Sequence, residues 1–258
     1  MTRIIAISTN KGGVLKSSIT GNLAGVLSED SKVLVVDTDN QGNATLSFGI
    51  QPDYCDLSTY DLMVKETDPG RIIKKINDNI DIIPSNDDMS FLEFEVLTNT
   101  QNFDKPFQLL KRGLSNIKDK YDYILIDTPP NLGLTQGNVL AAADEILIPF
   151  QPEPFSMRSL GKMLQAVEKF RVNHNPFLKV LGVVGTLIDN RTVLHSDIMQ
   201  KCRRFCYEND VPMFDTEIQR VIRYAESVAK HGLPATLTTK RPEYVQPYYD
   251  LKGEIVNV

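Results

Sequence analysis

The amino-acid sequence predicts an α/β protein built on a single doubly wound, mostly parallel sheet with helices on both faces. Short runs of β-branched and other apolar residues alternate along the chain with segments whose apolar residues recur at the helical period. Such alternation is typical of parallel sheets that are covered on both sides. With 258 residues, 41% apolar content and no low-complexity linker, one domain over residues 1–258 is expected to hold a full core.

Each expected element follows from the residue pattern. Apolar runs predict strands at residues 4–7, 32–37, 80–84, 123–127, 145–150 and 179–188. Ser58 and Asp61 match a capping box, which predicts a short helix that ends at Val64. Helical periodicity predicts one helix directly after the first strand and others at residues 106–117, 132–143, 157–170, 196–207, 217–230 and from 244 onward.

The first strand leads directly into residues 10–18, Asn-Lys-Gly-Gly-Val-Leu-Lys-Ser-Ser. A strand, a glycine turn and a helix N-terminus together suit a phosphate group, because the backbone approaches closely and its amides favour negative charge. Lys16 is expected to reach the terminal phosphates and the Ser17 hydroxyl to ligate Mg²⁺. An ordinary glycine-rich turn is the alternative. The phosphate site is favoured because the lysine and the hydroxyl stand where a P-loop requires them.

Two further strands end on carboxylates. Asp37 ends the second strand and Asp39 lies two residues further on, while Asp127 ends the fourth. Carboxylates at the mouth of a buried strand are costly unless they hold a ligand, a metal-bound water or a basic partner. Solvated turn residues are the alternative for the first pair, and many strands end in a single aspartate. Beside a P-loop, however, Asp127 is expected to hold Mg²⁺.

The glycine loop resembles the deviant Walker A motif, KGGVGK[ST], of the ParA/MinD group of P-loop ATPases. Residues 37–45 are similar to that family's D-x-D-P-Q-G-N-A-T segment, with Asn40 in place of proline, and residues 127–133 to its D-x-P-P-S-L-G. Residues 189–192 resemble D-A-R-T, and residues 231–234 resemble H-G-K-P. The resemblance spans essentially the whole chain, and its spacing is similar to that of the shorter, Soj-like ParA proteins.

This resemblance implies a MinD-like P-loop NTPase fold, ATP and Mg²⁺ as cofactors, and ATP hydrolysis around a nucleotide sandwich homodimer. It implies that Lys11 reaches across to the partner's phosphates and that Asp39 orients the attacking water. Lys11, Lys16 and Asp39 are therefore the candidate catalytic residues, with Ser17 and Asp127 as metal ligands. The candidate nucleotide-binding residues are Lys11, Gly12, Gly13, Val14, Leu15, Lys16, Ser17 and Ser18.

Leu15 departs from the family pattern, which has glycine before the Walker lysine. A side chain at this position is expected either to turn outward toward the dimer partner or to widen the loop. Leu15 is therefore expected to weaken ATP binding or turnover. A nucleotide- and DNA-binding scaffold with little or no hydrolysis is the main alternative to an active ATPase.

The resemblance also implies a plasmid or chromosome partition protein whose dimer binds DNA non-specifically until a ParB-like centromere-binding partner stimulates hydrolysis. The net charge of −5 means that any DNA contact must come from a local patch. Ile198, Cys202 and Phe205 are expected to be buried on the 196–207 helix, and nearby acids almost balance its basic face. The candidate DNA-contacting residues are Arg191, Lys201, Arg204, Arg220 and Arg223.

Several other classes are disfavoured. The chain begins with the P-loop strand, so neither a helix-turn-helix extension nor a signal peptide is expected, and no apolar run approaches membrane-spanning length. The three cysteines are odd in number and lack the spacing of a metal site, which favours a reducing compartment and hence the cytoplasm. Association with the nucleoid is expected from the resemblance. A MinD-like membrane positioner is disfavoured because the C-terminal segment is acidic and interrupted rather than a basic amphipathic helix.

Overall fold

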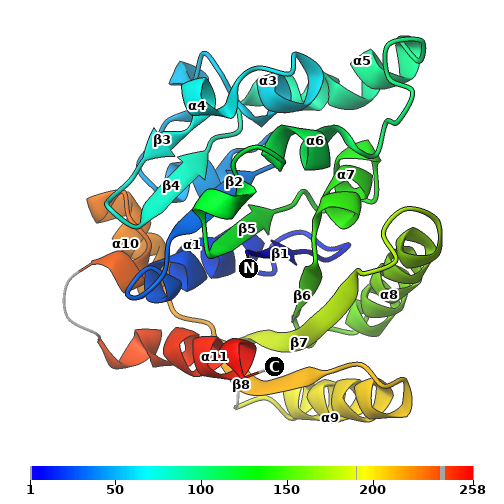
Figure 1. The fold of residues 1–258 in the computed structure, drawn as a ribbon. Helices are drawn as coiled ribbons and strands as arrows, with labels where there is room; N and C mark the ends of the chain where they lie inside the picture. Colours follow the sequence, from blue (N-terminus) through cyan, green and yellow to red (C-terminus); the bar gives the residue numbers. More distant parts are fainter. Residues whose placement is uncertain (1, 190, 239–241, 258) are drawn as a thin grey trace.

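The computed structural model describes residues 2–189, 191–238 and 242–257. Within these ranges one eight-stranded sheet has the order β3-β4-β2-β5-β1-β6-β7-β8 (Figure 1). Neighbouring strands run parallel except β3, which is antiparallel to β4. The strands are β1 (Arg3–Ile7), β2 (Val33–Asp37), β3 (Lys74–Lys75), β4 (Ile80–Ile83), β5 (Tyr123–Asp127), β6 (Glu145–Phe150), β7 (Lys179–Ile188) and β8 (Met213–Gln219).

Helices pack on both faces of this sheet, which confirms the doubly wound α/β prediction (Figure 1). One core contains residues of α1 (Lys16–Leu27), α2 (Asn43–Ser47), α10 (Arg223–His231) and α11 (Gln246–Val256). The other core contains residues of α3 (Thr59–Val64), α4 (Pro69–Ile72), α5 (Leu92–Thr98), α6 (Leu109–Leu114), α7 (Leu134–Ala142), α8 (Ser156–Asn173) and α9 (Val193–Glu208).

The central strands explain why two cores form. Successive side chains of a strand point to opposite faces, so Ile5 and Ile7 of β1 enter one core while Ile4 and Ala6 enter the other. A strand buried on both sides must therefore be apolar throughout. The last residues of β1, β2 and β5 lie beside one another, with Ile7 and Asp37 both in register with Asp127. Ligands bind at such carboxyl ends in doubly wound sheets.

The prediction of a helix over residues 217–230 is wrong in its first part. Residues 213–219 form β8, which pairs with β7 at the edge of the sheet, and α10 begins only at Arg223. Phe214 and Ile218 are buried, whereas Asp215 between them is exposed, so this edge strand lacks the continuous apolar run of a central strand. Arg220 consequently lies in the β8–α10 connection rather than on one helix with Arg223.

Other element predictions hold with shifted boundaries. The capping box at α3 is confirmed, because the Ser58 amide donates to Asp61 at 2.8 Å. The helix predicted at 106–117 is shorter as α6, and the one predicted at 196–207 is longer as α9. On α9, Cys202 is buried as expected, but Phe205 is only half-buried. No helix in the described ranges is both long and apolar enough to span a bilayer.

Candidate nucleotide-binding site

The loop between β1 and α1 has the backbone form of a phosphate-binding turn. Gly13 has a φ of 71°, a value that favours glycine. Lys16 is the first residue of α1, and its ammonium group donates a hydrogen bond across the loop to the backbone oxygen of Lys11 at 3.1 Å. Burial lowers the pKa of Lys16, and an anion beside it would favour the charged form. The N-terminus of α1 and the buried Lys16 therefore lie together at this loop, where both would favour a bound anion.

Asp127 ends β5 directly beside the start of α1. Its carboxylate accepts hydrogen bonds from the Ser17 hydroxyl at 2.6 Å and from the Thr20 hydroxyl at 3.3 Å. Burial, and after it the negative charge of Asp37, raises the pKa of Asp127 to about 8. A divalent cation would offset the cost of burying this carboxylate, and hydroxyl and carboxylate oxygens are the ligands that Mg²⁺ prefers. Ser17 and Asp127 therefore fit a magnesium ion.

Protein side chains alone do not complete such a site. Among the described residues, no group of three or more His, Cys, Asp or Glu side chains is placed to hold a metal. Mg²⁺ usually retains several waters and binds through one or two protein groups together with substrate phosphates. The Ser17–Asp127 pair matches that mode, and the ion would depend on a bound nucleotide.

Asp37 and Asp39 lie at the carboxyl end of β2 and differ in surroundings. Asp37 is fully buried and accepts hydrogen bonds from the Thr45 amide at 2.8 Å and hydroxyl at 2.7 Å, which fix α2 against the sheet. Burial raises its pKa to about 6. Asp39 accepts from the Gln41 amide at 3.1 Å, and burial also raises its pKa, although the charge of Lys16 opposes the shift. Asp39 therefore belongs to the same electrostatic cluster as Lys16.

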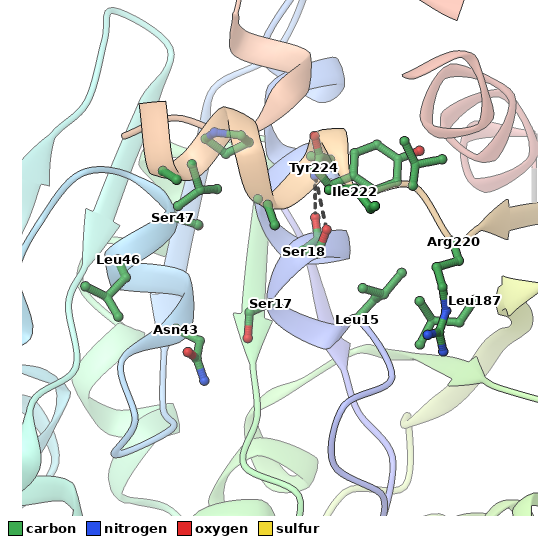
Figure 2. Close-up of a pocket in the computed structure, with 17 residues that line it drawn as sticks. Leu15, Ser17, Ser18, Asn43, Leu46, Ser47, Leu187, Arg220, Ile222 and Tyr224 are labelled. Carbon is green, nitrogen blue, oxygen red and sulfur yellow. Dashed lines mark hydrogen bonds between the residues drawn. The ribbon is translucent and has the colours of Figure 1, made fainter. Parts of the chain in front are cut away.

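Leu15 keeps the loop geometry that a glycine would adopt. Its φ of 68° and ψ of 21° place it in the left-handed region at the N-cap of α1. The side chain is half-buried and packs against the core that contains α1, α2, α10 and α11. It also lines a cavity of about 450 Å³ (Figure 2). Figure 2 shows it on the side of the loop that faces Leu187 and Arg220. The Leu15 side chain thus borders this open pocket, and its expected position toward a dimer partner stays a prediction.

Lys11 is held by its own chain. Its ammonium group lies 2.6 Å from a Glu153 carboxylate oxygen and donates to the Ser156 hydroxyl at 3.2 Å and to Gln151 at 3.4 Å. Gln151 also donates to Glu153 at 2.6 Å. Sequence reasoning assigned Lys11 to the nucleotide but gave no role to these three residues. Gln151 and Glu153 directly follow the strand predicted at residues 145–150, and this position at the carboxyl end of a strand was the available signal.

The candidate DNA-contacting residues do not form one uniform patch. Lys201 and Arg204 are exposed on α9, and Arg204 pairs with Glu208 at 2.7 Å. Arg191 is exposed and pairs with Asp189 at 2.9 Å, while its neighbour Asn190 in the predicted motif lies outside the described residues. Arg220 lines the cavity next to Leu15. Arg223, the first residue of α10, stacks 5.4 Å from the centre of the Tyr244 ring.

Two glycines bring α2 and α10 together. Gly49 follows α2 with a φ of 74°, and Gly232 ends α10 with a φ of 60°. A Cβ added to Gly49 would lie 2.9 Å from the backbone oxygen of Gly232, so only hydrogen fits between the two backbones. The turn that follows α2 and the C-terminal end of α10 are therefore in direct backbone contact.

The sheet order, the glycine loop and the Ser17–Asp127 contact define a P-loop nucleotide-binding domain. Comparison with known proteins agrees, because residues 2–180 match a family model described as an AAA domain. The chain is 35% identical to the sporulation initiation inhibitor protein Soj of Bacillus subtilis, over 99% of this chain and 98% of Soj. It is 31% identical to the chromosome partitioning protein ParA of Myxococcus xanthus, over 98% and 88% of the two chains. The chain belongs to the ParA/MinD family of P-loop ATPases.

A solved structure supports the fold. The chain superposes with a TM-score of 0.85 and 25% identity on cobyrinic acid a,c-diamide synthase of Mycobacterium smegmatis, covering 100% of this chain and 95% of that one. That structure contains an ATP analogue and magnesium. The MinD-like P-loop fold predicted from the sequence is confirmed.

Proposed function

We propose that the protein is an ATP-dependent DNA partition protein that acts on a plasmid or a chromosome in the cytoplasm. Its single domain dimerises around ATP and Mg²⁺, binds the nucleoid DNA non-specifically, and is released when a ParB-like centromere-binding partner stimulates hydrolysis. The observation that carries this proposal is the convergence of Lys16, Ser17, Asp39 and Asp127 at the carboxyl edge of the sheet. Membership of the ParA/MinD family supports it.

The proposed chemistry assigns one task to each residue. Loop amides and Lys16 bind the β- and γ-phosphates. Ser17 and Asp127 hold Mg²⁺, which neutralises charge on the phosphates. Asp39 orients the attacking water, and it acts by position and charge rather than by strong proton abstraction. Asp37 is a positioning residue, because it holds Thr45 and with it the segment that carries Asp39.

The nucleoside is assigned to the cavity beside the loop. This cavity of about 450 Å³ starts at Leu15, Ser17 and Ser18, next to the proposed phosphate positions. Its far wall is formed by mostly apolar residues of the β8–α10 connection and of α10, such as Val221 and Ala225. A concave, mainly apolar pocket that opens onto polar groups suits a planar base and its ribose.

Dimerisation requires a change at Lys11. To reach the phosphates of a partner subunit, Lys11 must leave Glu153, which now holds it at 2.6 Å. A triphosphate carries more negative charge than one carboxylate, so the exchange is electrostatically favourable once ATP is bound. Lys11 therefore links nucleotide occupancy to association of the two subunits.

DNA binding is assigned to basic residues in two regions, the start of α10 beside the nucleotide site and the region of α9. Arg220 and Arg223 flank the start of α10, and Lys201 and Arg204 lie on α9. Arg191, which lies just before α9, is assigned to the second region. Such contacts would be to phosphates, sensitive to salt and without sequence readout. Because the net charge is −5, DNA binding must depend on such local basic residues rather than on the overall charge.

A second candidate function is a scaffold that binds nucleotide and DNA but hydrolyses ATP slowly or not at all. The position of Leu15 favours it, because its side chain borders the proposed nucleoside cavity where the family has only a glycine hydrogen. The two candidates share a site and differ only in turnover.

A phosphate-release assay with and without DNA and the partner distinguishes them, with ATP binding measured in parallel by calorimetry. Lys16→Ala removes the charge nearest the terminal phosphates and is expected to abolish ATP binding, whereas Lys120→Ala, an exposed lysine elsewhere, is expected to change nothing. Normal ATP affinity in Lys16→Ala would refute the P-loop assignment. Tight ATP binding without phosphate release under any condition would establish the scaffold.

A further inference from the structure

An exposed apolar stripe runs along α5 and the 3₁₀ turn before it (Asp87–Phe91). Phe91, Phe94 and Leu97 are exposed by 58%, 69% and 55%. They follow one another at intervals of three residues and so share one face, while Leu92 and Val96 on the other side are buried in the core. Single exposed apolar residues need no explanation, but a contiguous set of large ones marks an interaction surface.

The stripe lies in a strongly acidic surrounding. Residues 86–104 contain five carboxylates and no lysine or arginine. Glu93 is exposed beside Phe94, and the nearby Lys65 is already paired with Asp61 at 2.8 Å. The five carboxylates are Asp87, Asp88, Glu93, Glu95 and Asp104. This negative potential repels DNA and disfavours a second copy of the same surface, so the complementary occupant is cationic.

The stripe also adjoins the candidate site. α5 packs against α7, and a Cβ added to Gly133 would lie 3.0 Å from the Glu93 carboxylate. Gly133 ends the loop that follows Asp127. Figure 1 shows α5 at the periphery of the molecule beyond α6 and α7, where a second protein has access to it.

We propose that Phe91, Phe94 and Leu97 form the docking surface for a cationic amphipathic helix of a separate protein. The apolar face of that helix would cover the stripe, and its lysine or arginine residues would pair with the flanking carboxylates. Bound there, the helix would lie against the loop that leads from Asp127 to α7. This inference concerns binding alone and does not depend on ATP hydrolysis.

The test uses the full-length protein and a designed probe. The probe is a peptide of about 18 residues, five helical turns, with leucine on one face and lysine on the other. Its binding is measured by fluorescence anisotropy and mapped by backbone amide shifts in NMR. We expect shifts confined to residues 86–104 and 131–133. A peptide of the same pattern with glutamate in place of lysine is expected not to bind.

Two variants test the surface directly, and one serves as a matched control. Phe94→Ser and Glu93→Lys change exposed side chains and are each expected to weaken binding at least tenfold. Phe177→Ser removes an equally exposed aromatic residue that lies before β7, and it is expected to bind like the parent. Undiminished binding in Phe94→Ser, or equal binding of the glutamate peptide, would overturn the proposal. So would sedimentation of the nucleotide-free parent as a dimer that Phe94→Ser converts to monomer, because a second copy would then cover the stripe.

Discussion

Replacing Leu15 with glycine is expected to raise ATP affinity. The left-handed backbone at Leu15 costs a non-glycine residue about 1–2 kcal/mol, and glycine removes that strain. The variant also loses the burial of a half-buried leucine side chain, which offsets this gain in the free energy of unfolding, since full burial of a leucine contributes about 1.5–3 kcal/mol. Stability should therefore change little. Forcing a ligand against an extra side chain costs about 1–3 kcal/mol. Because about 1.4 kcal/mol is tenfold, Leu15→Gly should bind ATP about ten- to a hundredfold more tightly, and its hydrolysis should rise.

Calorimetry with two ligands separates the possible causes. Tripolyphosphate contacts only the loop, so its affinity should change much less than that of ATP if the side chain obstructs the nucleoside cavity. Leu15→Ala keeps the strained Cβ but removes most of the volume, and it should recover most of the ATP affinity. If Leu15→Gly and the parent match in ATP affinity, hydrolysis and dimerisation, Leu15 is a tolerated substitution and the scaffold reading loses its support. An equal gain for both ligands would instead indicate a loop widened by Leu15.

Three further predictions follow from the site. Asp39→Ala should bind ATP normally, hydrolyse it more slowly and remain longer as a DNA-bound dimer, and hydrolysis at the parent rate would remove Asp39 from its role. Arg220→Glu or Arg223→Glu should weaken non-specific DNA binding without affecting dimerisation, whereas Arg71→Glu, with the same charge change on α4, should not. An unchanged gel shift at low salt would place the DNA contact elsewhere. The raised pKa of Asp127 means that the native state holds a proton that the unfolded chain releases above about pH 4. The free energy of unfolding without nucleotide should therefore fall by about 1.4 kcal/mol per pH unit between about pH 6 and 8, and more steeply below pH 6, where the raised pKa of Asp37 contributes as well. Asp127→Asn should flatten this slope and weaken Mg²⁺-dependent ATP binding, and an identical pH slope in the variant would exclude Asp127 as the cause.

The sequence predicted the centre of the fold better than its edges. Central strands such as β5 and β6 are buried on both faces and read as continuous apolar runs, so their limits were predicted correctly. β8 is an edge strand with exposed polar residues, and the helix predicted at residues 217–230 wrongly includes its last three residues. The short helix α5 also escaped prediction, because two exposed apolar residues, Phe94 and Leu97, obscure its usual polar face.

Some contacts of the candidate site could likewise be predicted from the sequence, and others could not. Lys16, Ser17 and Asp127 could be predicted to meet, because a P-loop and a neighbouring strand end at one edge of the sheet. The contact between Lys11 and Glu153 joins residues 142 positions apart and depends on the course of the β6–α8 connection, which no local pattern specifies. The direction of the Leu15 side chain depends in turn on β7 and the β8–α10 connection, which border its cavity.

The contact between Gly49 and Gly232 has a mechanical consequence. Flexible side chains usually absorb small displacements between helices, but here two backbones meet and nothing compressible separates them. Any displacement that brings the turn after α2 closer to the C-terminal end of α10 would therefore meet backbone rather than a yielding side chain. This contact therefore sets the closest approach of α2 and α10, and a side chain introduced at Gly49 would have to separate the two backbones.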